Sequence, residues 1–211
     1  RQRQMCIRDS PMTIRVLLAE DQSLVRGALI ALLNAEPDIE VVAECATGTE
    51  AVALAQEQPI DVALLDIEMP GMNGIDAAKE LAGNRCRCLI VTTFGKAGYV
   101  KRAMEVGVDG FIVKDTPPEE LADAIRRVHA GLRVIDPTLA QESLLTPDNP
   151  LSERETEVCQ QLFEGKSSPS IAKALHLSPG TVRNHISNIM AKTGAGNRYE
   201  AAHLAKTNGW I

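Results

Sequence analysis

The sequence predicts an α/β fold: a doubly wound, five-stranded parallel sheet in the order 2-1-3-4-5, followed by a small all-α domain of four helices. Over residues 12–130, short apolar runs alternate with segments of helical periodicity, which is the pattern of β-α-β units and a parallel sheet. Right-handed crossovers leave few topologies, of which this order is the common five-stranded one. After residue 150 the apolar spacing is helical throughout.

The predicted strands are short apolar runs that end in polar residues. The third, Val62 to Leu65, has four apolar residues in succession and runs directly into Asp66 and a Pro-Gly turn. An apolar run too short for a helix indicates a strand that is buried on both faces. The strands are predicted at residues 14–19, 39–46, 62–65, 88–91 and 110–113, and the helices that follow them at 22–34, 48–58, 75–82, 99–106 and 117–128.

The second half begins with a linker. Residues 131–150 are rich in Pro, Thr, Asp and Asn, with one short helical piece expected around residues 139–144. Ser152 and Glu155 have the spacing of a capping box, which opens a helix that continues to about Phe163. Further helices are predicted at residues 170–175, 178–192 and 198–206. Two short helices joined by a tight turn within a domain at residues 151–211 suggest a helix-turn-helix.

Composition limits the classes of protein to consider. No apolar run approaches the roughly 18–20 residues of a membrane span, so we expect a cytoplasmic protein without membrane insertion. The five cysteines are scattered, and Cys86 and Cys88 have no histidine or third cysteine nearby, which favours reduced thiols over a metal site. Residues 1–11 lack periodicity and predict a disordered or spurious leader before a natural start at Met12.

Charge is distributed unevenly along the chain. Residues 12–136 carry 12 Lys/Arg against 20 Asp/Glu, whereas residues 151–211 carry 7 against 5. No carboxylate occurs between Glu164 and Glu200, a segment with five Lys/Arg residues. An acidic first domain and a locally basic second one favour a nucleic-acid partner for the second.

Several polar side chains are expected at one edge of the sheet. Strand one ends in Glu20 and Asp21, strand three in Asp66, strand four in Thr92 and strand five in Lys114. A single Asp at a strand end is more often a turn-forming residue than a reactive one. However, strands one and three are neighbours in the predicted order, so three carboxylates converge where open α/β sheets place their ligands.

A divalent cation resolves the repulsion between these carboxylates, and a few carboxylates with water and phosphate oxygens suit Mg²⁺. With Lys114 for a phosphoryl oxygen and Thr92 as a hydroxyl donor, the set predicts a phosphoryl-accepting site. Asp66 is the predicted nucleophile. Glu20, Asp21 and Asp66 are the predicted metal ligands, together with the backbone carbonyl of Glu68.

Residues 13–130 resemble the receiver domain of two-component response regulators, at Glu20-Asp21, Leu65–Gly71, Thr92 and Lys114. The resemblance implies that a sensor histidine kinase phosphorylates Asp66, with Thr92 and Phe111 as the switch pair. A core phenylalanine is an equally good interpretation of Phe111.

The predicted helix at residues 178–192 separates into two faces. Val182, Ile186 and Ile189 share the apolar face, and the polar side chains face outward. A recognition helix needs this division, with groups near its N-terminus that bond base edges. Arg183 suits guanine and Asn184 adenine, with Ser187 on the same outer face. Thr181, His185 and Lys192 suit phosphates. An ordinary polar surface is the alternative, and the segment without carboxylates favours DNA.

This part is similar to the LuxR/NarL-type helix-turn-helix of the NarL/FixJ family, at Leu151–Glu155, Gly165, Ile171-Ala172, Thr181-Val182 and His185. Glu20-Asp-Gln22, Asp66-Ile-Glu68, Thr92-Thr-Phe94, Gly98-Tyr99 and Gly209-Trp210 together resemble regulators of membrane-fluidity (fatty-acid desaturase) two-component pairs.

These features predict a non-enzymatic, phosphorylation-dependent transcription regulator that forms a homodimer on promoter DNA, with the first and fifth helices at the dimer surface. One alternative is a Mg²⁺-dependent phosphatase with an aspartyl nucleophile, although the Asp-x-Asp form is absent because Glu68 stands two residues past Asp66. The other is a DNA-binding regulator that works without phosphorylation.

Overall fold

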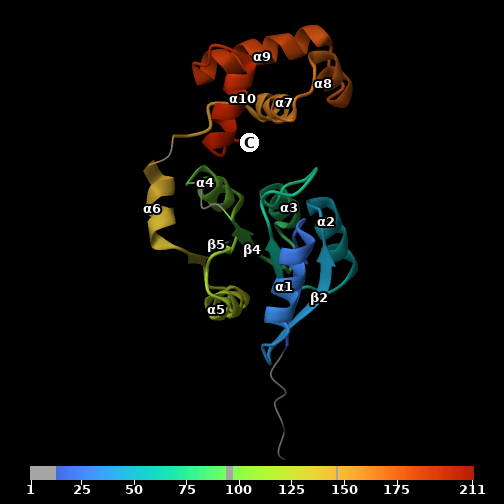
Figure 1. The fold of residues 1–211 in the computed structure, drawn as a ribbon, viewed down its shortest axis with the longest axis vertical. Coiled ribbons are helices and arrows are strands. Elements are labelled where there is room, and N and C mark those ends of the chain that lie inside the picture. The colour runs from blue at the N-terminus through green and yellow to red at the C-terminus, as the bar shows by residue number, and fades with distance from the viewer. Residues whose placement is uncertain (1–12, 94–96, 146) are drawn as a thin grey trace, which may run out of the picture. The chain divides into compact units, whose positions relative to one another are not determined.

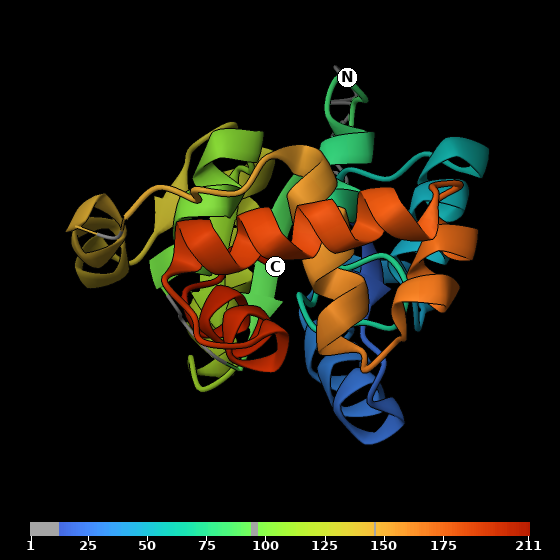
Figure 2. The same cartoon turned by 90° about the horizontal axis from the view of Figure 1, so that it is seen from above.

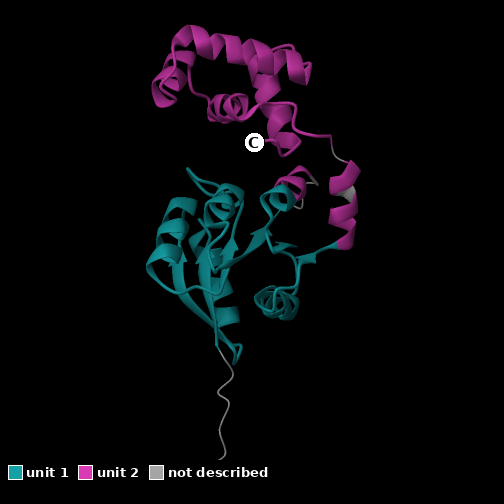
Figure 3. Cartoon of the chain, turned by 180° about the vertical axis from the view of Figure 1, so that it is seen from behind, with its two compact units in different colours: residues 1–94, 103–136 teal, residues 95–102, 137–211 magenta. Residues whose placement is uncertain are grey.

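The computed structural model describes residues 13–93, 97–145 and 147–211, so the predicted leader at 1–11 lies outside the described residues. The chain divides into two compact units, residues 1–94 with 103–136 and residues 95–102 with 137–211 (Figure 3). Each unit has an apolar core of its own. Among the described residues, no helix combines the length and the hydropathy that a membrane span requires.

A parallel sheet in the order β2-β1-β3-β4-β5-β6 is the centre of the first unit (Figure 1). The predicted order of the first five strands is confirmed. The described strands are β1 (Ile14–Ala19), β2 (Ile39–Cys45), β3 (Val62–Leu65), β4 (Arg87–Thr92), β5 (Gly110–Val113) and β6 (Val134–Ile135). β6 is not among the predicted strands, because two residues are too few to show a periodicity. The predicted linker therefore begins with a strand that pairs with Gly110 and Phe111.

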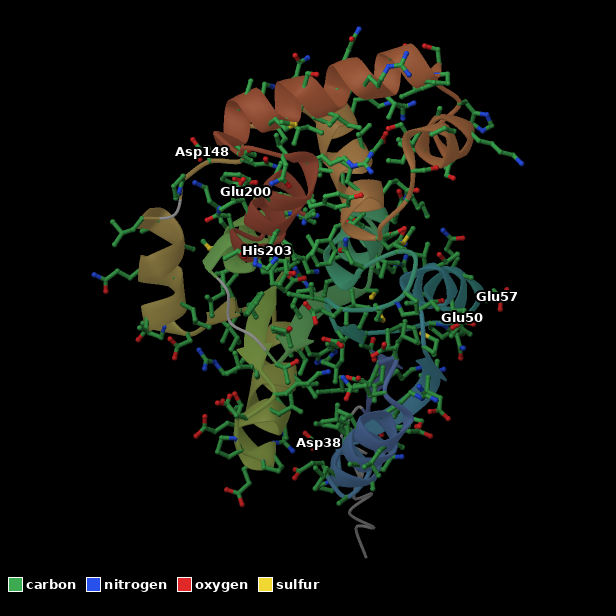
Figure 4. The ribbon with its side chains drawn as sticks, turned by 45° about the horizontal axis from the view of Figure 1, so that its top comes forward. Asp38, Glu50, Glu57, Asp148, Glu200 and His203 are labelled. Atoms are coloured by element: carbon green, nitrogen blue, oxygen red, sulfur yellow. The ribbon has the colours of Figure 1, made fainter. Side chains whose placement is uncertain are left out.

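Helices connect these strands, namely α1 (Ser23–Leu33), α2 (Gly48–Glu57), α3 (Gly74–Leu81), α4 (Ala97–Val106) and α5 (Pro118–His129). Leu33 of α1 and Ile125 of α5 belong to the same buried cluster as strand residues such as Leu64, so α1 and α5 cover one face of the sheet. Arg126 of α5 adds a bidentate contact to Asp38, at 2.8 and 2.6 Å. Asp38, labelled in Figure 4, lies in the turn between α1 and β2. This contact lowers the pKa of Asp38.

Strand register brings the predicted site residues to one edge. Ala19 pairs with Leu65, so the residues that follow them, Glu20 and Asp66, lie side by side. Thr92 pairs with Val113 on the neighbouring strands, which places Lys114 next to the end of β4. Because all these strands are parallel, their carboxyl ends meet at the same edge, as the strand order predicts.

The second unit contains α6 (Pro137–Leu145), α7 (Glu153–Phe163), α8 (Ser168–Ala174), α9 (Pro179–Thr193) and α10 (Arg198–Thr207). The capping box of Ser152 and Glu155 is present at the start of α7. α8 begins two residues earlier than predicted because Ser167 accepts a hydrogen bond from the Ser170 amide. α9 is an uninterrupted helix of 15 residues, drawn in orange-red in Figure 2.

Candidate functional site

Three carboxylates meet at the carboxyl edge of the sheet. Glu20, Asp21 and Asp66 each place one oxygen so that these atoms lie within 4.8 Å of one another. Glu20 and Asp66 are almost fully buried, at 1% and 3% exposure, whereas Asp21 is exposed. One face of the cluster is therefore enclosed by protein and the other is open to solvent, as a metal site that also admits a substrate requires.

Lys114 provides the cation of this cluster. Its Nζ lies 2.5 Å from Glu20 Oε2 and 3.1 Å from Asp66 Oδ2. Burial would lower the pKa of Lys114, but the adjacent carboxylates of Glu20 and Asp66 outweigh burial and raise that pKa. Lys114 is therefore a fixed positive charge at neutral pH.

Asp66 shows the opposite balance. Burial raises its pKa, and the nearby Lys114 charge only partly offsets the cost of ionising a buried carboxyl. Its Oδ1 atom is buried and has no hydrogen-bond partner among the described residues. A buried carboxylate oxygen without a donor is costly, and a hard cation relieves that cost. The residues present therefore fit Mg²⁺, with Glu20, Asp21 and Asp66 as side-chain ligands.

The remaining predicted residues of this site lie around the three carboxylates. Thr92 is fully buried at the end of β4, and its carbonyl accepts the Lys114 amide at 2.7 Å. Phe111 is 1% exposed and lies inside the core, so this structure holds it in the position of an ordinary core side chain. Glu68 is exposed in the turn after β3, where Met69 N–H donates to the Ile67 carbonyl at 3.0 Å.

Two further residues that are not among the predicted site residues hold this site in shape. Arg26 of α1 donates to the backbone carbonyl of Glu20 at 2.6 Å and to Glu44 at 3.0 Å. Gly74, the first residue of α3, lies so close to the third strand that an added Cβ would be 2.1 Å from the Asp66 carbonyl oxygen. The signal in the sequence for Arg26 was a basic residue in the first turn of the helix that follows the acidic pair.

α9 carries the candidate nucleic-acid interface. Val182, Ile186 and Ile189 are buried in the core of the second unit, as the two-faced helix predicts. Arg183, Asn184 and Ser187 are exposed, whereas Thr181 and His185 are half-buried. Ser178 caps the helix through the Thr181 amide at 3.0 Å, and its hydroxyl also bonds the Thr181 hydroxyl at 2.8 Å. The exposed face presents hydrogen-bonding side chains near a helix N-terminus.

Lys192 stands apart from that group. It lies in the last turn of α9, and its Nζ is 2.6 Å from the buried Glu155 carboxylate of α7. Burial would raise the pKa of Glu155, but the bonds from Lys192 and Ser152 lower it, so this carboxylate is ionised at neutral pH.

Comparisons with known proteins agree with this geometry. Residues 16–126 match the response regulator receiver domain, and residues 149–205 match the luxR family of bacterial regulatory proteins. The chain is 46% identical over 198 residues to the transcriptional regulatory protein DesR of Bacillus subtilis (strain 168), covering 94% of this chain and 99% of that protein. It is 35% identical over 206 residues to the response regulator protein VraR of Staphylococcus aureus (strain NCTC 8325 / PS 47), covering 92% and 97%.

Solved structures show the same likeness. The response regulator ChrA of a heme-sensing two-component system is similar with a TM-score of 0.55 and 34% identity, covering 95% of this chain and all of that one (100%). A LuxR-family response regulator from Aurantimonas sp. SI85-9A1 is similar with a TM-score of 0.59 and 33% identity, covering 63% of this chain and 96% of that one.

Proposed function

The chain belongs to the LuxR-family response regulators, DNA-binding transcription regulators with a receiver domain, and we propose that Asp66 is the phosphoacceptor that controls it. The observation that carries the proposal is the buried Asp66 carboxylate, which has one oxygen 3.1 Å from Lys114 and the other without a hydrogen-bond donor among the described residues. The first oxygen is balanced by a fixed cation. The second is available to a metal ion.

A sensor histidine kinase is the proposed phosphoryl donor. One Asp66 oxygen attacks the phosphorus, the bond from phosphorus to the donor nitrogen breaks, and an acyl phosphate forms on Asp66. Lys114 moves from Glu20 towards a phosphoryl oxygen, and the Thr92 hydroxyl donates to another. When bound at Glu20, Asp21, Asp66 and the Glu68 carbonyl, Mg²⁺ neutralises charge on the phosphoryl group. Phe111 then changes packing together with Thr92.

DNA is the proposed ligand of the α9 outer face. Arg183 and Asn184 are exposed, and Arg and Asn side chains can form bidentate bonds to guanine and adenine in the major groove. Ser187 is the next residue on that face, and Thr181 and His185 flank it near phosphates. Because double-stranded DNA is held in the cytoplasm of a bacterium, the proposed site of action is cytoplasmic.

Phosphorylation is proposed to act by favouring a homodimer through α1. Its outer face is apolar over successive turns, and the exposed residues on it are Leu24, Gly27, Ala28, Ala31 and Leu32. Leu24 is 86% exposed and Leu32 is 45% exposed, although both are large apolar side chains. The small residues between them allow close approach of a second helix. A dimer places two α9 helices on half-sites about one helical turn of DNA apart.

The test is phosphorylation of the full chain by acetyl phosphate with Mg²⁺, followed by intact-mass analysis and selection of bound fragments from random-sequence DNA. We expect one phosphoryl group on the wild type and on Asp123→Ala, an exposed carboxylate on α5. We expect none on Asp66→Ala. An acyl phosphate on Asp66→Ala would show that the phosphoacceptor is another residue.

The same preparation separates the alternatives. Repeated turnover of small phosphoesters would identify a phosphatase, whereas a single phosphorylation event per chain supports the regulatory switch. Equal DNA affinity of wild type and Asp66→Ala under phosphorylating conditions would identify a DNA-binding protein that works without phosphorylation.

A further inference from the structure

Two adjacent residues of α7 contact the C-terminal end of α8 and the last turn of α9. Glu155 Oε2 lies 2.6 Å from Lys192 Nζ in the last turn of α9. The guanidinium of Arg154 donates at 2.5 Å to the carbonyl of Leu175, the residue that ends α8 before the turn into α9. The first turn of α7 therefore fixes the entry to α9 and its final turn.

The Glu155 end of this arrangement is enclosed by protein. Glu155 is 4% exposed, and Oε2 accepts the Ser152 amide at 2.8 Å in addition to Lys192. The Lys192 side chain is 41% exposed. A phosphate contact would draw the Lys192 ammonium away and leave an ionised carboxylate buried without its cation, which is strongly unfavourable.

We propose that Glu155 and Lys192 form a positioning pair that sets the orientation of α9 for DNA, and that Lys192 does not contact a phosphate. The inference rests on the proposed DNA-binding role of α9, and it replaces the expectation that Lys192 binds a phosphate. Arg154 holds the end of α8, and with it the start of the turn that leads into α9, through the Leu175 carbonyl. Base-edge contacts from α9 depend on its orientation, because hydrogen-bond geometry tolerates little displacement.

Glu155→Gln distinguishes the two possible roles of Lys192, because they predict opposite changes in DNA affinity. Gln retains the capping box at this helix position, so the substitution removes the charge and spares the start of α7. If Lys192 is a positioning residue, Glu155→Gln weakens DNA binding by about tenfold. If Lys192 contacts a phosphate, the same substitution frees the ammonium and tightens binding. Glu164→Gln is the matched control, because Glu164 is exposed and pairs with Lys166 at 2.7 Å.

Salt dependence separates the two roles a second time. Each phosphate contact adds about 0.9 to the slope of log affinity against log salt concentration. We expect Lys192→Met to weaken binding with an unchanged slope, and the double variant Glu155→Gln/Lys192→Met to recover affinity because no buried charge is left unpaired. Arg183→Met, on the exposed face of α9, is the comparison variant that loses a DNA contact.

The probe is a duplex selected from random-sequence DNA with the full wild-type chain under phosphorylating conditions, and melting curves verify that each variant is folded. Tighter binding by Glu155→Gln than by Glu164→Gln would overturn the proposal. A slope reduced by about one in Lys192→Met would do the same. If the wild type selects no DNA, the proposed function fails, and that outcome differs from a wild type that binds with Lys192 at a phosphate.

Discussion

The ammonium of Lys114 lies 2.5 Å from the carboxylate of Glu20, closer than the 3.1 Å that separates it from Asp66. In the unmodified protein, Lys114 is therefore held by a proposed metal ligand as well as by the proposed phosphoacceptor. A metal ion at this cluster would compete with Lys114 for Glu20, and an acyl phosphate on Asp66 would give Lys114 a new anionic partner. Under the proposed function, this exchange of partners would link metal binding to phosphorylation.

Lys114→Met should raise the affinity for Mg²⁺ and slow phosphorylation. Loss of the ammonium makes the carboxylate cluster more negative, which favours the divalent cation. The phosphoryl group loses a preorganised cationic donor, which costs about 10²–10³ in rate. Calorimetric titration with Mg²⁺ and the rate of phosphorylation by acetyl phosphate measure the two effects. Arg127→Met is the control, because Arg127 is exposed on α5 and lies 3.9 Å from Asp123. Weaker Mg²⁺ binding by Lys114→Met would contradict the competition.

Asp66→Asn should stabilise the metal-free protein at neutral pH. The pKa of Asp66 is raised by burial, so the folded state binds a proton more tightly than the unfolded state. Its ionisation therefore costs stability as the pH rises above the ordinary carboxyl pKa of about 3.9. We expect a melting temperature a few degrees above that of the wild type at pH 7, with the difference vanishing as the pH falls below that value.

In excess Mg²⁺ the wild type should have the higher melting temperature and Asp66→Asn the lower one. A cation that binds the folded state stabilises the wild type more than Asp66→Asn, because the variant lacks one anionic ligand. Melting in chelator and in excess Mg²⁺ measures both effects, with Asp123→Asn as the exposed control. A wild type that is already more stable than Asp66→Asn in chelator would show that Lys114 compensates the buried charge fully.

Gly74→Ala should impair the site as well as the fold. The added Cβ would lie 2.1 Å from the Asp66 carbonyl oxygen and 2.8 Å from its carbonyl carbon, so the turn after β3 must move. We expect a loss of about 1–3 kcal/mol in the free energy of unfolding, as for other overpacked sites, together with slower phosphorylation. Gly27→Ala on α1 is the matched control, because nothing lies within 4 Å of its added Cβ. Normal phosphorylation of a folded Gly74→Ala chain would show that the turn shifts without disturbing Asp66.

The sequence predicts which carboxylates meet at the edge of the sheet better than it predicts the packing around them. Glu20 and Asp66 could be placed together because strand order alone decides which strand ends are neighbours. β6 could not be predicted, since two residues show no alternation. The pair Glu155 and Lys192 is 37 residues apart and depends on how α7 and α9 cross. Periodicity gives the buried face of each helix, but it does not give the side-chain pair between two helices.

Leu24→Arg should prevent the phosphorylation-dependent dimer while sparing the monomer. Leu24 is 86% exposed, so the substitution should change the free energy of unfolding of the monomer by no more than about 0.5 kcal/mol, as surface substitutions usually do. In a dimer the new charge would be buried against the apolar outer face of a second α1. Sedimentation with acetyl phosphate and Mg²⁺ measures the association. Leu144→Arg, the same change at a site of 79% exposure on α6, is the matched control. If both variants dimerise as the wild type does, the dimer surface lies elsewhere.

His176→Val should destabilise the second domain, whereas His176→Gly should not. His176 has a φ of 53°, the left-handed region, and is placed in the turn between α8 and α9. A β-branched side chain is poorly tolerated there, and the left-handed conformation costs roughly 1–2 kcal/mol for an L-residue. Glycine avoids that cost but loses more backbone entropy on folding, so its net effect is close to neutral or slightly stabilising.

Melting of the full chain, with His203→Val on the exposed face of α10 as control, measures the contrast between the two His176 variants. Because this turn leads into α9, His176→Val should also weaken DNA binding. The melting temperature of the receiver domain should change little. Equal destabilisation by Val and Gly would show that the His176 side chain, and not its backbone conformation, stabilises the turn.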